Sequence, residues 1–128
     1  MYPVLDHIYR IAGKNNRSFV YQNHNDSFRI AYNDILYFQS EGRKINIVMK
    51  DGIETFYGKL SAMEEKVPEF FLRIHKSYLV NQNYVKEFTY EWVKMINGDI
   101  LNISKANRAK VRRKILESAA DEFRNIIT

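Results

Sequence analysis

Short runs of β-branched and aromatic residues, broken by Gly, Asn and Asp, fill the chain from residue 17 to residue 103. Such runs are typical of β-strands. They predict strands at residues 17–22, 27–32, 35–40, 44–49, 53–58, 70–74, 78–80, 84–92, 93–96 and 100–103. No long helical pattern alternates with them, so we expect a mostly β fold of antiparallel strands with peripheral helices.

The residues between the runs predict where the chain turns. Residues 23–26 are expected to form a hairpin loop, and Glu41-Gly42 the next turn. Asp51-Gly52 is a signal for a type I′ hairpin turn, and Asn97-Gly98 marks another turn. This density of turns favours small antiparallel sheets.

Two stretches have helical spacing instead. The first is expected to begin with Ser61 as its N-cap and Glu64 in the capping-box position, and to end before Pro68. The second is expected to have Ser104 as its N-cap and to run to about Leu116. Its inward side chains are predicted to be Val111, Ile115 and Leu116.

Positive charge is concentrated in one short segment. The 128 residues carry a net charge of +5, and residues 104–114 carry six basic side chains and no acidic one. These side chains are Lys105, Arg108, Lys110, Arg112, Arg113 and Lys114. A localised positive field suits a polyanionic partner.

Residue types that carry catalysis or bind metals are sparse. The chain has no cysteine, and His7, His24 and His75 are not spaced as metal ligands. It has no nucleophile elbow and no glycine-rich phosphate loop. We therefore expect no enzyme, no catalytic residue, no metal and no cofactor. Neither a secretory signal nor an apolar run of about 18 residues occurs, which favours the cytoplasm and no membrane segment.

The segment 69–85 gathers hydrogen-bond donors at a predicted break between strands. An apolar approach leads into Arg73, His75 and Lys76, and Ser77 follows. These residues could form an exposed basic turn that contacts a ligand. Alternatively, Arg73 and Ser77 could brace the loop internally while His75 is partly buried.

This segment resembles the signature of the LytTR DNA-binding domain of bacterial response regulators, F-x-R-x-H-x-S-[FY]-[LIV]-V-N. The matching residues are Phe71, Arg73, His75, Ser77, Tyr78, Val80 and Asn81. Further stretches resemble the flanking motifs of the family in the same order: 34–38, 50–52, 57–60 and 99–105. The likeness covers about residues 17–116.

The resemblance implies elongated antiparallel β sheets with a short helix and a C-terminal helix. It also implies sequence-specific double-stranded DNA binding through loops in the major groove, as the output domain of a transcription regulator. Pairing on promoter direct repeats and a fused or partner receiver domain are further implications. Residues 1–16 are then an N-terminal stub or linker, 17–116 the DNA-binding domain and 117–128 a C-terminal helical extension.

Three loops carry the DNA contacts that the resemblance implies. The candidate residues, in chain order, are Arg43, Lys44, His75, Lys76, Lys105, Asn107, Arg108 and Arg112. Arg43 is the best candidate for a bidentate contact with guanine, because a guanidinium matches its O6 and N7 atoms. Lys105 suits a phosphate better than a base, and Arg112 would add sequence-independent attraction.

A second interpretation is a protein-interaction module, in which the basic C-terminal helix docks on an acidic protein or an anionic lipid surface. A basic run is also often only a solvated helix face. The DNA-binding interpretation makes a geometric demand that the others do not. The turns that carry Arg43, Lys76 and Lys105 must lie on one side of the molecule.

Overall fold

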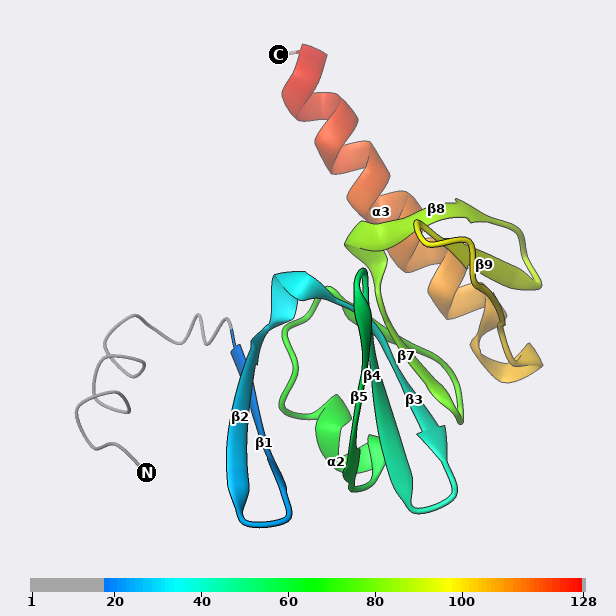
Figure 1. Cartoon of the computed structure of the whole chain (residues 1–128). Coiled ribbons are helices and arrows are strands. Elements are labelled where there is room, and N and C mark those ends of the chain that lie inside the picture. Colours follow the sequence, from blue (N-terminus) through cyan, green and yellow to red (C-terminus); the bar gives the residue numbers. More distant parts are fainter. Residues whose placement is uncertain (1–17, 128) are drawn as a thin grey trace.

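A computed structural model of the chain describes residues 18–127, which form three antiparallel sheets and a long C-terminal helix (Figure 1). The strands are β1 (Ser18–Asn23), β2 (Asp26–Ala31), β3 (Ile35–Glu41), β4 (Lys44–Met49), β5 (Gly52–Tyr57), β6 (Phe71–His75), β7 (Tyr78–Asn81), β8 (Val85–Phe88), β9 (Trp92–Met95) and β10 (Ile100–Asn102). The helices are α2 (Leu60–Glu64) and α3 (Arg108–Ile127), with 3-10 turns η1 (Tyr32–Asp34), η2 (Gln82–Tyr84) and η3 (Lys105–Asn107). The predicted mostly β fold with a short helix and a C-terminal helix is confirmed. The stub predicted at 1–16, which includes His7, lies outside the described residues.

The central sheet is buried on both faces. Its strand order is β5-β4-β3-β7-β6. The β1–β2 hairpin and α2 cover one face, and the three-stranded sheet β10-β9-β8 and α3 cover the other. The central strands therefore separate two hydrophobic cores.

Aromatic rings fill the first core. The ring of Phe19 lies 5.4 Å from Phe38 and 5.3 Å from Phe56, and Phe38 lies 5.5 Å from Phe71, between ring centroids. Pairs of this kind stabilise by about 0.5–1.5 kcal/mol beyond the burial of their area. They hold the β1–β2 hairpin against the sheet.

The second core sets the position of α3. Val111 and Ile115 of α3 are buried with Leu72 and Ile74 of β6. Burial of each aliphatic side chain contributes about 1.5–3 kcal/mol. The first turns of α3 are thus fixed beside the end of β6.

Within residues 18–127, no helix is both long and apolar enough to cross a membrane.

Two polar side chains form long-range hydrogen bonds, one within the central sheet and one from that sheet to the segment between β9 and β10. Asn81 is fully buried, donates from Nδ2 to the carbonyl of Ile35 at 3.1 Å, and accepts the N–H of Asn83 at Oδ1. The Tyr37 hydroxyl donates to Asp99 Oδ2 at 2.7 Å. Burial, and then this hydrogen bond and the negative charge of Asp99, raise the pKa of Tyr37 above its ordinary value.

The single strand predicted at 84–92 is wrong, because Thr89 turns the chain. β8 ends before this residue and β9 begins after it. The Thr89 Oγ1 accepts the backbone N–H groups of Glu91 and Trp92, each at 3.1 Å. A hydroxyl that satisfies two main-chain donors takes the place of strand pairing at this point.

The type I′ turn predicted at Asp51-Gly52 is also wrong. Met49 pairs with Gly52, so Lys50 and Asp51 are the turn residues. Neither of them has a positive φ, whereas a type I′ turn needs two. Gly52 instead begins β5.

The start of α2 differs from its prediction. The helix begins at Leu60, so Ser61 lies inside its first turn and Lys59 precedes it without a side-chain cap. Glu64, expected to complete a capping box, forms an ion pair with Arg73 at 2.7 Å. A tertiary partner has replaced the local one.

The start and end of the second helix differ as well. Ser104 precedes η3 and makes no side-chain cap, and α3 begins only at Arg108. The helix continues past Leu116 to Ile127. Leu116 is 46% exposed, so its prediction as an inward residue is wrong, while Val111 and Ile115 are buried as expected.

Candidate nucleic-acid interface

Arg43 lies at the end of a tight hairpin between β3 and β4. Glu41 pairs with Lys44, which leaves Gly42 and Arg43 as the two turn residues. Gly42 has a φ of +63°, the conformation that the first position of a type II′ turn requires. The turn is thus one residue later than Glu41-Gly42, and Arg43 and Lys44 are both exposed.

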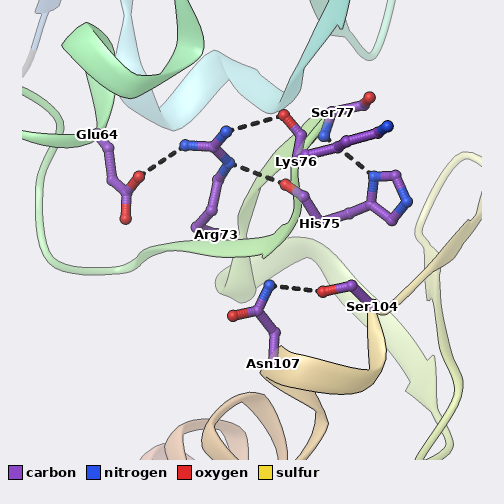
Figure 2. Close-up of polar contacts among 7 residues, drawn as sticks. All are labelled: Glu64, Arg73, His75, Lys76, Ser77, Ser104 and Asn107. Carbon is purple, nitrogen blue, oxygen red and sulfur yellow. Dashed lines mark hydrogen bonds and ion pairs between the residues drawn. The ribbon is translucent and has the colours of Figure 1, made fainter.

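Arg73 fixes the backbone of the β6–β7 turn (Figure 2). Its Nε donates to the carbonyl of His75 and one terminal nitrogen donates to the carbonyl of Lys76, both at 2.8 Å. The other terminal nitrogen binds Glu64 of α2 at 2.7 Å. Because all three bonds hold the guanidinium, Lys76 is presented on a braced backbone with its side chain exposed.

His75 also serves the turn. Its Nδ1 accepts the backbone N–H of Ser77 at 3.0 Å, and its ring lies 5.3 Å from that of Tyr78 (Figure 2). A nitrogen that accepts this bond is unprotonated, which leaves Nε2 as the ring donor. Arg73 and His75 therefore brace this turn through side-chain bonds to its backbone, and Lys76 is its exposed cation.

The third segment begins at Ser104. Its Oγ accepts a hydrogen bond from Asn107 Nδ2 at 2.7 Å, and Arg108 Nε donates to the carbonyl of Ile103 at 3.2 Å. Asn107 and Arg108 are half-buried, whereas Lys105 is exposed. Of the candidates in this segment, two are engaged internally and Lys105 points its charge into solvent.

Backbone hydrogen bonds join the three turns. The N–H of Ser40 donates to the carbonyl of Ser77 at 2.9 Å, and the N–H of Ser104 donates to the carbonyl of Ile74 at 2.9 Å. Figure 1 shows the ends of the β3–β4 and β6–β7 hairpins and the start of η3 along the same side of the molecule. The turns that carry Arg43, Lys76 and Lys105 therefore lie on one side of the molecule.

A hollow of about 540 Å³ lies between the first two turns. Arg43 and Lys76 both border it. Sequence reasoning missed two further residues at its edge, Lys59 and the 73% exposed Tyr57. The N–H of Gly58 donates to the carbonyl of Arg43 at 3.1 Å, which brings the end of β5 beside this turn. The stretch 57–60 resembles a flanking motif, but only that pairing shows that Lys59 lies beside Arg43.

The exposed cations of these turns are available to an external anion. Arg43, Lys76 and Lys105 take part in none of the ion pairs formed within residues 18–127. Arg112, on α3, is exposed as well. No group of three or more metal-ligating side chains occurs in this part of the chain. The arrangement suits contact with phosphates and base edges.

Known proteins resemble this chain over most of its length. A family model described as the LytTr DNA-binding domain matches residues 25–116. The sensory transduction protein LytT of Bacillus subtilis (strain 168) is 32% identical over 90 residues, which are 65% of this chain and 36% of that protein. The chain thus spans about a third of the length of this relative.

Among solved structures, a LytTr DNA-binding domain from Bacillus cereus superposes with a TM-score of 0.65. The match covers 78% of this chain and 96% of that chain, at 22% identity. At this identity the likeness shows the fold.

Proposed function

The chain belongs to the LytTR family of DNA-binding domains, and from that premise we propose that it binds promoter DNA sequence-specifically as the output domain of a bacterial transcription regulator. One observation carries the proposal: three exposed turns with Arg43, Lys76 and Lys105 are joined on one side by main-chain hydrogen bonds. Loops on a stiff β scaffold hold their side chains well enough to select a base sequence.

We assign different roles to the exposed cations. Arg43 contacts a guanine in the major groove, because its guanidinium can donate two parallel hydrogen bonds. Lys76 and Lys105 contact phosphates or single base acceptors. Lys44 and Arg112 add attraction that does not depend on sequence.

The remaining candidates act mainly by positioning. Asn107 and Arg108 hold the third turn through the hydrogen bonds already described. His75 holds the second turn through Nδ1 and keeps Nε2 for DNA. We propose no catalytic role for any of them.

The surroundings of the domain are proposals too. We propose that residues 17–116 form the DNA-binding unit, that two copies bind adjacent direct repeats, and that a fused or separate receiver domain controls it. The site of action is then the cytoplasm, where the promoter DNA lies. The relative LytT is described as a sensory transduction protein, which supports control by a signal.

Selection from a random duplex library, followed by fluorescence anisotropy, tests the function. We expect one preferred motif, with Arg43→Ala losing about 1–3 kcal/mol of discrimination at one base pair. Arg112→Ala is expected to weaken all duplexes alike and to lower the salt slope by about 0.9.

Lys86→Ala provides the control, since Lys86 is an exposed lysine of β8, outside the three turns. Recovery of no preferred motif would contradict sequence-specific binding and favour the protein-interaction alternative. A preferred motif that Arg43→Ala leaves unchanged would contradict the assignment of this residue alone.

A further inference from the structure

The last three turns of α3 carry an apolar stripe that the described part of the chain leaves uncovered. Leu116, Ala120 and Phe123 follow one another at positions i, i+4 and i+7, which share one side of a helix. Leu116 is 46% exposed and Phe123 62% exposed. Figure 1 shows this part of α3 extending beyond the sheets.

The stripe is not the face by which α3 docks on the core. Val111 and Ile115 point into the second core. At about 100° per residue, the stripe lies roughly a third of a turn away from them. The Ser118 Oγ donates to Gln82 Oε1 at 3.1 Å, which holds the helix in this orientation. The helix therefore has two apolar faces, and only one is used.

A hollow of about 530 Å³ continues the stripe toward the body of the domain. It lies between Tyr90 and α3, where Ala109, Leu116 and Ala120 form part of its wall. Tyr90 is itself 49% exposed. Neighbouring exposed apolar side chains bordered by charged residues are typical of a protein contact.

The DNA-binding part of the chain does not account for this surface. The family match ends at residue 116, where the stripe begins. The β3–β4 and β6–β7 hairpins and η3 lie toward the start of α3, away from its C-terminal end (Figure 1). The stripe needs a partner of its own.

We propose that the stripe pairs with the same stripe of a second copy of this chain, with the two helices antiparallel. Placing Ala120 opposite Phe123 of the second copy sets a small side chain against a large one. In that register Glu117 faces Arg124 of the second copy, and the twofold axis repeats both contacts. A twofold axis cannot relate two copies on direct repeats, so this contact is separate from the pairing proposed on DNA. The stripe is thus complementary to itself in both shape and charge.

The charged residues at its edge are suited to this exchange. In the single chain Glu117 lies 3.9 Å from Arg113, and Arg124 lies 3.6 Å from Asp121. The side chains of both pairs are 60–72% exposed, so each pair contributes little and can reorganise. A parallel pair would instead set Ala120 against Ala120 and leave a gap there.

The first experiment is sedimentation equilibrium of the 128-residue chain without DNA, so its outcome is independent of the proposed function. We expect a concentration-dependent dimer, which Phe123→Glu weakens on the order of a hundredfold. The matched control is Ile53→Glu, because Ile53 is 61% exposed and lies on β5, an edge strand of the central sheet. This control should dimerise like the parent, and circular dichroism should show unchanged folding for both variants.

Charge reversal tests the antiparallel register. Glu117→Arg and Arg124→Glu should each weaken the dimer roughly fivefold, since symmetry affects two ion pairs at once. The double variant should recover the parent affinity. Each reversal also disturbs an intrahelical pair that the double variant does not repair, so recovery must come from across the interface.

Three results would overturn the proposal. A parent chain that stays monomeric at its highest soluble concentration leaves the stripe to a different occupant. A dimer that tolerates Phe123→Glu uses another surface. A double variant that is weaker than either single reversal contradicts the antiparallel arrangement.

Discussion

Arg73 allows the link between turn geometry and DNA binding to be tested directly. Its two bonds to the carbonyls of His75 and Lys76 come from a charged donor, and such bonds stabilise by about 1.5–3 kcal/mol when shielded from water. The Arg73 side chain is 21% exposed, so water competes for its donors. Each of the two bonds then stabilises the fold by about 1 kcal/mol. The ion pair with the more exposed Glu64 adds less than about 1 kcal/mol. Arg73→Ala should therefore lower the free energy of unfolding by about 2–3 kcal/mol.

The same substitution should weaken DNA binding without removing a DNA contact. A loosened turn must be ordered again on binding, at about 1–2 kcal/mol per residue, which predicts a loss of roughly tenfold. Since the Arg73 guanidinium already donates to two backbone carbonyls and to Glu64, the salt slope should stay at the parent value. Lys76→Ala, in contrast, should lower the slope by about 0.9. Urea unfolding gives the stability, and anisotropy titrations at several salt concentrations give the slopes.

Two variants serve as controls for this prediction. Glu64→Gln removes only the ion pair and should cost less than about 1 kcal/mol. Arg73→Lys should lower the free energy of unfolding about as much as Arg73→Ala, because one ammonium group cannot reproduce the planar set of guanidinium donors. The reasoning fails if Arg73→Ala changes the salt slope as much as Lys76→Ala, since Arg73 would then contact a phosphate.

Two further predictions concern stability. Because the pKa of Tyr37 is raised, the folded state favours its protonated phenol. The contribution of this group to the free energy of unfolding is fully present below about pH 10 and falls as the pH rises further. The loss of unfolding free energy from pH 9 to pH 11 should be shallower for Tyr37→Phe, and an unchanged slope would contradict the raised pKa of Tyr37. Asn81→Leu should lower the free energy of unfolding by about 1–3 kcal/mol, because it leaves the buried carbonyl of Ile35 without its donor. A loss below about 1 kcal/mol in urea unfolding would show that this bond is replaced.

The sequence predicted the strands best where they are central. The runs at 35–40 and 44–49 became β3 and β4 with little change, because apolar residues that pack against both cores have few alternatives. The sequence predicts Thr89 as a strand residue, since β-branched residues favour strands. Its side chain instead satisfies two main-chain donors, and only the local geometry reveals this choice.

The candidate interface was predictable as a set of segments but not as a set of free side chains. Arg43, Lys76 and Lys105 are exposed as expected. Asn107 and Arg108 look the same in sequence, yet their polar groups bond within the third turn. A basic or amide side chain has both options, and the choice depends on which carbonyls the fold brings within reach.

The second apolar face of the C-terminal helix is hard to predict from sequence for a related reason. A helical pattern with one apolar face predicts one docking surface, so Leu116 was grouped with Ile115. The two residues are adjacent in sequence and therefore about 100° apart on the helix. Only the position of the core shows that they belong to different faces.

The bond between Ser104 and Ile74 has a consequence for the order of events during synthesis. The first two turns are complete once residue 81 has emerged from the ribosome, but the segment with Lys105 emerges more than twenty residues later. A nascent or truncated chain that ends before Lys105 contains every strand of the central sheet. It still lacks one of the three turns. An interrupted translation product should then bind the operator more weakly than the finished molecule and compete poorly with it for the promoter.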